Sequence, residues 1–220
     1  AKPERLLRQA IEVSNAKIAK LRETDPKSPE LIKEAQHIFV LRAKLLRYQE
    51  FYLNKDLVSL DDAVTTMTRD LKQTNFELKD AQDRLSCSKS KHRRRVMIEE
   101  GKSAEIDALD AQEFPEERKL ADIMREKKLS VKDMTKAQLE ARQRWMDHIL
   151  VAEDLKRPVK YFENEIDISN GKIQTATAKI ADLETKLAKS KTIQKELEAK
   201  KAAVKAAQTA LKSEFSKMFG

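Results

Sequence analysis

The sequence predicts an all-α protein, an elongated antiparallel coiled-coil hairpin or helical bundle with long, heptad-patterned helices. Turn-forming residues are scarce, with only 3 Gly and 5 Pro in 220 residues, and aromatic residues make up only 5%. Strand-rich folds need frequent turns and many β-branched and aromatic side chains. In addition, apolar residues recur at alternating spacings of three and four over two long stretches, which keeps one helix face toward a partner helix.

Residues 1–52 are predicted to form a helical hairpin base. Its first helix, from about residue 4 to 23, ends at the turn 25–29, where two prolines disfavour helix continuation, and Ser28 caps the next helix with Pro29 at its first position. The first helix faces the second through Leu7, Ile11, Ile18 and Leu21. The second helix has an apolar face wide enough for two neighbours, made by Leu31, Ile32, Ala35, Ile38, Phe39, Leu45, Leu46, Tyr52 and Leu53.

Residues 53–85 are predicted to be the first coiled-coil arm. Its seam positions follow each other by four and three without interruption, and a single one of them, Thr74, is polar. They are Leu53, Leu57, Leu60, Val64, Met67, Leu71, Thr74, Leu78, Ala81 and Leu85. A period of 3.5 residues this long is typical of a coiled-coil seam.

Residues 131–189 are predicted to be the second arm. Its seam positions are Val131, Met134, Gln138, Ala141, Trp145, His148, Ala152, Leu155, Val159, Phe162, Ile166, Ser169, Ile173, Ala176, Ile180, Leu183 and Leu187. Pro158 falls inside this register and removes one backbone hydrogen bond. We expect a kink there that preserves the seam; the alternative is a helix boundary at Pro158.

The two arms are similar in length, and residues 86–130 between them are long enough to reverse the chain as a charged tip or connector. The simplest arrangement is therefore an antiparallel hairpin. A parallel homodimer would use the same heptads, with residues 86–130 as an irregular middle section.

A basic block adjoins an acidic block in this tip. The basic residues, with no acidic residue among them, are Arg84, Lys89, Lys91, Arg93, Arg94 and Arg95. Eight acidic residues follow between 99 and 117, and Lys102 is the only basic residue in that range. The basic residues are candidates for binding an anion, either nucleic-acid backbone or lipid head groups. The alternative is that the two blocks neutralise each other across a turn near Gly101.

Residues 190–220 are predicted to form a basic amphipathic helix. Its apolar stripe is Leu197, Val204, Leu211, Phe215 and Met218, and its candidate contacts to a partner or lipid are Lys195, Lys200, Lys201 and Lys205. Such a helix can lie on an anionic membrane or in the groove of a partner. Packing against its own protein is the simpler expectation.

No catalytic residue, metal site or cofactor is predicted. Three glycines do not make a phosphate-binding loop, and the histidines lack metal-ligand spacing. Trp145 and His148 are interpreted as packing residues of the seam. The single cysteine, Cys87, is either an ordinary exposed thiol or one made reactive by the adjacent basic residues. Because a single cysteine cannot form an internal disulfide, we expect a reducing, cytoplasmic environment, either free or peripheral to a larger assembly or membrane. Without an apolar run of membrane-spanning length, no span is expected.

One short segment has a counterpart in a known family. Ile18, Ala19, Lys20, Leu21 and Arg22, followed by Asp25, Pro26, Lys27 and Ser28, resemble a helix corner in the fungal eisosome membrane-scaffold proteins. The resemblance covers about 20 of the 220 residues, and the flanking helices do not follow the pattern of that family. It implies a BAR-type fold that polymerises on anionic lipid.

We therefore expect a non-enzymatic scaffold that assembles or tethers protein partners, including other copies of itself, by helix packing, with contacts at the tip and the chain ends. No small-molecule substrate is expected. The alternative hypothesis is a basic helical scaffold that binds membranes, as BAR domains do, or nucleic-acid backbone.

Overall fold

The computed structural model describes residues 2–127 and 129–220. It is 91% helical, and the described residues contain no strand, so the predicted all-α helical bundle is confirmed. Ala1 and Lys128, which fall within the predicted base and tip, lie outside the described residues.

The long and short helices are α1 (Lys2–Thr24), α2 (Pro29–Glu99), α3 (Ile106–Glu113), α4 (Pro115–Lys127), α5 (Lys136–His148) and α6 (Val159–Phe219). Single 3-10 turns occupy Ser103–Glu105, Val131–Asp133 and Asp154–Lys156. The chain divides into two compact units, which we call the terminal unit (residues 1–69 and 183–220) and the middle unit (residues 70–182). Each unit is described by itself.

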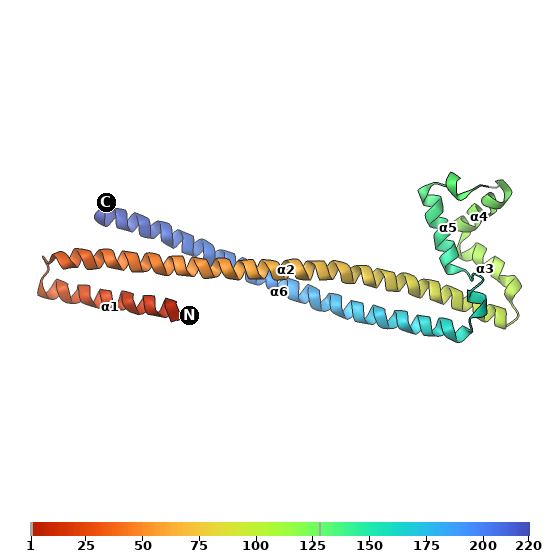
Figure 1. Cartoon of the computed structure of the whole chain (residues 1–220), viewed down its shortest axis with the longest axis horizontal. Coiled ribbons are helices and arrows are strands. Elements are labelled where there is room, and N and C mark those ends of the chain that lie inside the picture. The colour runs from red at the N-terminus through yellow and green to blue at the C-terminus, as the bar shows by residue number, and fades with distance from the viewer. Residues whose placement is uncertain (1, 128) are drawn as a thin grey trace. The chain divides into compact units, whose positions relative to one another are not determined.

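In the terminal unit, α1 lies antiparallel to α2 (Figure 1). The Glu30 N–H donates to Ser28 Oγ at 3.3 Å, which confirms the predicted turn and cap. The four predicted contact residues of α1 are half-buried around the buried Ser14. Ser14 Oγ donates to Glu34 Oε1 at 2.8 Å, and Gln49 Nε2 donates to Glu4 Oε1 at 3.1 Å. These polar bonds fix the register of the two helices.

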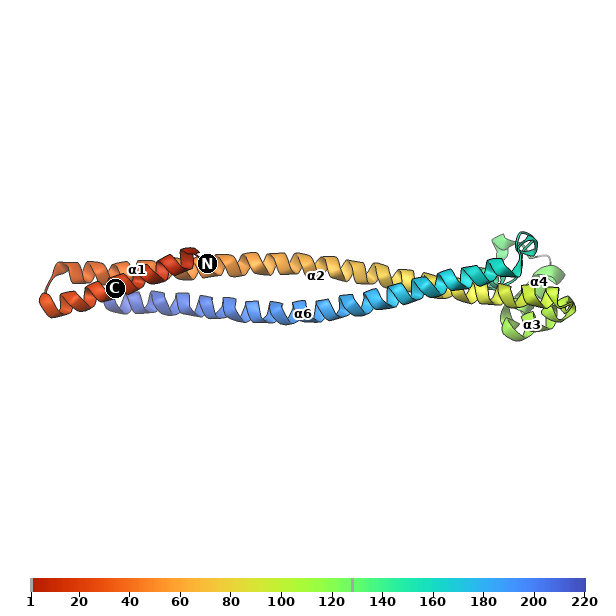
Figure 2. The ribbon, with the colours of Figure 1, turned by 90° about the horizontal axis from the view of Figure 1, so that it is seen from below.

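The end of α6 packs on the other side of α2 in the terminal unit (Figure 2). The Phe39 ring meets the Phe215 and Phe219 rings edge to face, with centroids 5.4 and 5.8 Å apart. Gln208 Nε2 donates to Glu50 Oε2 at 2.6 Å. Most of the predicted wide face of α2 is accordingly buried or half-buried, as are Leu197, Val204 and Leu211 of α6.

Four predicted packing residues of the terminal unit are nevertheless exposed. Ile32 and Tyr52 of α2 are 56% and 39% exposed, and Phe215 and Met218 of α6 are 38% and 60% exposed. Each lies at the margin of its helix face, where the neighbouring helix does not cover it. The sequence analysis also missed Leu41, which is buried in the same unit.

The first predicted seam is confirmed at all ten positions, each of which is buried or half-buried on α2. Besides Phe162, the buried positions of the seam within the middle unit carry the small side chains Thr74, Ala81, Ser169 and Ala176. Thr74 Oγ1 satisfies itself by donating to Asp70 O at 2.7 Å. Small residues at these positions let the backbones of α2 and α6 approach closely.

The second predicted seam is confirmed only from Val159 onward, where every position through Leu187 is buried or half-buried. The continuous helix predicted across Pro158 is wrong, because α5 ends at His148 and α6 begins at Val159. Arg157, directly before the proline, has an extended backbone with ψ of 139°, the conformation that a following proline imposes. Pro158 is therefore a helix boundary.

The seam residues predicted before this boundary need correction. Val131 and Leu155 are 50% and 52% exposed, and Ala152 is also exposed. Trp145 is half-buried, but it lies on α5 beside α4 and not in the seam between α2 and α6. The spacing of three and four continues by coincidence through a segment that folds into separate short helices.

The first arm also continues beyond its predicted end at Leu85, because α2 extends to Glu99. Its end is a Schellman-type cap: the Gly101 N–H donates to Ile98 O at 3.1 Å and the Lys102 N–H donates to Met97 O at 2.8 Å. Gly101 adopts φ of 74°, which glycine accepts without strain. The basic block is thus helical, and α3, α4 and α5 gather beside this end of α2 (Figure 1).

Candidate functional site

The basic block of α2 is largely paired with acidic residues in the middle unit. Arg93 Nη1 lies 2.9 Å from Glu113 Oε1, which belongs to the acidic block. Arg84 pairs with Asp80 at 3.1 Å, and Arg95 pairs with Glu99 at 3.7 Å. The pairs of Arg93 and Arg95 join the two blocks and favour the hypothesis that they neutralise each other, whereas Asp80 lies outside the acidic block.

Arg94 has the most deeply buried side chain of the block, with 0% exposure. Its Nε and Nη2 both donate to Asp110 Oδ1, at 2.9 and 2.7 Å. Its Nη1 donates to Ser90 Oγ at 2.6 Å, and Ser90 Oγ donates in turn to His148 O at 2.7 Å. This network joins α2, α3 and the end of α5. Arg94 is therefore a structural residue and is not accessible to a ligand.

Lys91 joins α2 to the segment that precedes α6. Its Nζ lies 2.9 Å from Asp154 Oδ2, and the Val151 N–H donates to the same oxygen at 3.0 Å. Burial raises the pKa of Asp154, but the hydrogen bonds from Lys91 and Val151 outweigh it and hold the pKa below its ordinary value.

This depressed pKa predicts an acid-sensitive contribution to stability. The contribution is fully present above about pH 3.9, the ordinary value of an aspartate, and is lost as the pH falls through the lower value of the folded protein. We expect Asp154→Asn to lower the free energy of unfolding by about 1.5–3 kcal/mol at pH 7 and by less at pH 2.5. Urea unfolding at the two pH values tests this, and a loss independent of pH would contradict it.

Cys87 is half-buried beside the end of α5, with Sγ 3.8 Å from His148 Nε2. Burial, and then Asp147, raise the pKa of Cys87. Lys91 of the basic run does lower this pKa, but burial and Asp147 outweigh it, so the thiol is not activated, and it is half-buried where an exposed thiol was the other expectation. His148 is half-buried, as predicted, but it ends α5 and does not belong to the seam between α2 and α6; its ring lies between Ser86 and Cys87 of α2 and Phe114, whose ring centroid is 5.2 Å away.

Lys89 and Arg93 line one open pocket, while Arg84 and Lys91 line a separate one on the side of Asp154. We call the pocket of Lys89 and Arg93 the tip pocket; it has a volume of about 470 Å³, and its other main lining residues are Ser86, Glu113, Phe114 and His148. They come from α2, from the junction of α3 and α4, and from the end of α5. Lys89 and Arg93 are among the basic residues predicted from the sequence, and Glu113 belongs to the predicted acidic block. The places of Phe114 and His148 were not predictable, because more than 20 residues separate them from Arg93.

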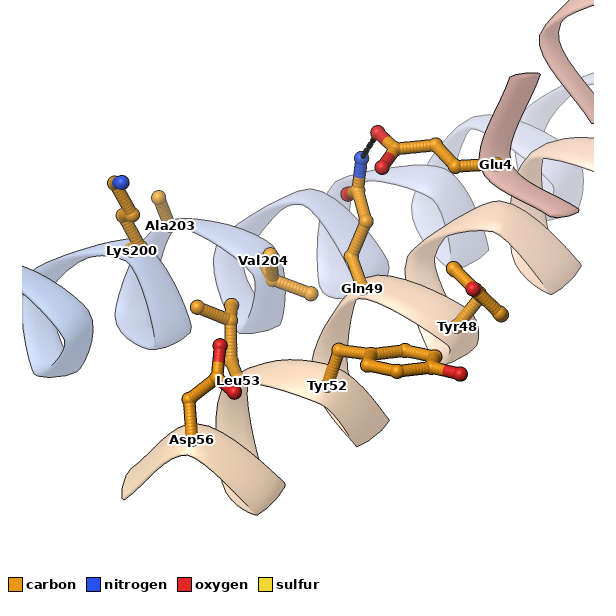
Figure 3. Close-up of a pocket in the computed structure, with 9 residues that line it drawn as sticks. All are labelled: Glu4, Tyr48, Gln49, Tyr52, Leu53, Asp56, Lys200, Ala203 and Val204. Carbon is orange, nitrogen blue, oxygen red and sulfur yellow. Dashed lines mark hydrogen bonds between the residues drawn. The ribbon is translucent and has the colours of Figure 1, made fainter. Parts of the chain in front are cut away.

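A second site lies in the terminal unit, where α1 begins. We call it the aromatic groove; it has a volume of about 520 Å³, and Figure 3 shows the residues that line it. Tyr48, Tyr52 and Leu53 form one wall on α2, and Ala203 and Val204 form the other on α6. The sequence signal for it was the concentration of Tyr48, Phe51 and Tyr52 within five positions of an aromatic-poor chain.

Tyr48 and Tyr52 of this groove contact each other, Tyr52 is 39% exposed, and Phe51 adjoins the groove without lining it. The Tyr48 and Tyr52 centroids lie 4.6 Å apart, and Phe51 meets Tyr52 at 5.3 Å while itself 61% exposed. The Tyr48 hydroxyl is buried and finds no hydrogen-bond partner among residues 2–127 and 129–220. The adjacent Tyr52, and then burial, raise the pKa of Tyr48 to about 12. Tyr48 is therefore a neutral donor at any physiological pH.

The candidate lysines of α6 are spread around the helix and do not form one cluster. Lys200 lines the aromatic groove, Lys201 is half-buried, and Lys195 and Lys205 are exposed. The helix that carries them packs on α2, so the expectation that it packs against its own protein agrees with the structure.

Within the described parts of the chain, no helix is long and apolar enough to cross a membrane. The same residues include no group of three or more His, Cys, Asp or Glu side chains placed to hold a metal ion.

The fold and these two sites define the class of protein as an all-α helical bundle with an apolar groove in one unit and a polar pocket in the other. Comparison with family models, with curated proteins and with solved structures finds no match to the chain.

Proposed function

We propose that the protein is a non-enzymatic structural protein that assembles by helix packing, and that the aromatic groove receives a helix of a second copy. The observation that carries this proposal is the uncovered aromatic wall of the groove. Exposed aromatic side chains beside a well-packed apolar floor are characteristic of contact surfaces that dominate binding energy. In a chain with 37% charged residues, an exposed patch of aromatic side chains marks a site of interaction with another molecule.

The groove continues an interface that the chain already makes. Helix α1 packs along α2 as far as Glu4, where Gln49 Nε2 donates to its carboxylate, and the groove opens beside this point (Figure 3). A further helix placed there would prolong the packing of α1. It would also offer an acceptor to the unpaired Tyr48 hydroxyl, whose burial without a partner is costly.

A second copy supplies a suitable apolar stripe. Leu6 and Val13 lie seven residues apart on the outer side of α1 and are 51% and 68% exposed. Residues separated by seven share one face of a helix. If this stripe of one copy enters the groove of the other, the contact is reciprocal, as the closed symmetry of most dimers requires.

The experiment is light scattering coupled to size exclusion over a range of protein concentrations. We expect a dimer whose dissociation constant rises by about tenfold or more in Phe51→Glu, because a charge in the contact opposes burial of the aromatic wall. Val13→Glu tests the opposite side of the contact and is expected to act in the same direction. Both residues are exposed, so circular dichroism should show an unchanged helix content.

Ile32→Glu is the matched control. Ile32 is 56% exposed on the same helix as Phe51, and it lies about five turns away from it. Dimerisation should be unchanged in this variant. A protein that is monomeric at all concentrations would overturn the proposal, and so would an equal effect of Ile32→Glu and Phe51→Glu.

A further inference from the structure

The tip pocket presents more positive than negative charge. Three cations lie at or beside it, namely Lys89, Arg93 and Arg94, and they meet two carboxylates. Asp110 pairs with Arg94. Glu113 is shared by two arginines, with Oε1 2.9 Å from Arg93 Nη1 and Oε2 3.7 Å from Arg94 Nη2. Lys89 has no ion pair with the described residues. One positive charge on the pocket wall is therefore not neutralised.

The sharing of Glu113 allows a second charge to be released. Because Glu113 already lies within reach of Arg94, it can pair with Arg94 alone when an anion binds Arg93. Lys89 and Arg93 are four residues apart on one face of α2, so both side chains can reach the same ligand. The pocket then offers two positive charges to a ligand with two negative charges.

A hydroxyl and an imidazole complete the pocket. His148 Nδ1 lies 2.6 Å from Arg144 O, and a carbonyl can only accept, so Nδ1 carries the hydrogen. Nε2 of the neutral ring therefore accepts from Ser86 Oγ, 3.2 Å away. The Ser86 hydroxyl can rotate its hydrogen toward a bound oxygen instead. A ligand with several acceptor oxygens satisfies Ser86, Lys89 and Arg93 at once.

We propose that the tip pocket binds a phosphate monoester through Lys89, Arg93 and Ser86. A monoester carries nearly two negative charges at neutral pH and three acceptor oxygens, and the guanidinium fork of arginine matches phosphate geometry. A volume of about 470 Å³ suits a small phosphorylated molecule or the head group of a phosphorylated lipid. The site is independent of the assembly proposed for the terminal unit.

The experiment is a calorimetric titration at low salt with phenyl phosphate, and in parallel a sedimentation assay with vesicles of phosphatidylcholine containing phosphatidic acid, whose head group is also a monoester. Diethyl phosphate and vesicles containing phosphatidylserine are the diester counterparts. We expect the monoester to bind at least about tenfold more tightly than the diester, because the second charge is paired only in the monoester.

Lys89→Ala and Arg93→Ala are each expected to weaken binding by about tenfold. Arg84→Ala is the matched control, since Arg84 is an exposed arginine of the same helix that also pairs with an acid and lies outside the tip pocket. Its affinity should stay within about twofold of the parent, as loss of a distant exposed charge allows.

Binding of phenyl phosphate identifies a soluble ligand, and binding only to phosphatidic acid vesicles identifies a lipid head group. Either result supports the site when Lys89→Ala and Arg93→Ala weaken the observed binding. Three results would overturn it: no binding in either assay, equal losses in all three variants, or no preference for monoester over diester. Each of the last two would show a diffuse charge effect.

Discussion

Replacing Arg94 with Met is expected to lower the free energy of unfolding by about 3–5 kcal/mol, the largest effect of a polar substitution in this protein. The Arg94 side chain is 0% exposed, and two of its nitrogens bind Asp110, which is itself nearly buried. Without the guanidinium, the Asp110 carboxylate loses its partner in a site where water cannot replace it. Ser90 Oγ loses a donor as well.

Urea unfolding followed by the fluorescence of Trp145, the single tryptophan, reports on the middle unit, in which Arg94 lies. Arg93→Met is the control. The Arg93 side chain is 63% exposed in its ion pair with Glu113, so we expect the free energy of unfolding to fall by less than about 1 kcal/mol. The double variant Arg94→Met with Asp110→Leu removes both charges and should recover part of the stability. Equal losses for Arg93→Met and Arg94→Met would contradict a buried, structural Arg94.

The seam between α2 and α6 was predictable because a 3.5-residue period is a local property that survives into the structure whenever a helix is long. All ten positions from Leu53 to Leu85 follow it, and so do the positions from Val159 onward. The same rule failed between Val131 and Leu155. The short helical segments around this stretch have buried residues of their own, such as Leu120 and Met134. The spacing of apolar residues does not indicate where a chain stops packing on one helix and begins to pack on another.

The tip pocket was predictable only in its cations. The run of basic residues followed by acidic ones indicated mutual pairing, and the pair Arg93–Glu113 agrees with that interpretation. Which arginine is buried depends on the position of α3, which the cap at Gly101 sets. Neighbouring arginines at 93 and 94 point about 100° apart around a helix, so one faces the pocket and the next faces Asp110. Sequence alone does not distinguish them.

The two proposed surfaces differ in chemistry because their helix neighbours differ. In the terminal unit, α1 and α6 together cover only part of α2, and Tyr52 remains 39% exposed beside the start of α1. In the middle unit, α3 and α5 bring Glu113 and His148 against one face of α2. The first arrangement suits another helix and the second suits a small anion, so substitutions at one surface are expected to leave the other unaffected.

Replacing Phe162 with Ala is expected to lower the free energy of unfolding by about 3–5 kcal/mol. Phe162 is 2% exposed and lies one turn into α6, immediately after the boundary at Pro158. Its ring meets that of Tyr161 at 5.3 Å, and Arg157 lies over the Tyr161 ring at 4.2 Å. Removal of the Phe162 ring leaves a cavity that neighbouring backbones, held by helix hydrogen bonds, cannot fill.

Ile168→Ala is the matched control for this change, because Ile168 lies on the same helix and is 52% exposed; we expect a loss of no more than about 0.5 kcal/mol. Urea unfolding of both variants, followed by Trp145 fluorescence, separates the two cases. The result bears on the helix boundary as well as on packing. If Pro158 merely kinked one continuous helix, its hydrogen bonds would hold the start of α6 without Phe162. Because α6 begins there, the buried Phe162 ring adds to the polar contacts that join this segment to α2, such as the hydrogen bond from Arg95 Nε to Arg157 O at 3.0 Å, and a loss below about 1 kcal/mol would contradict this role.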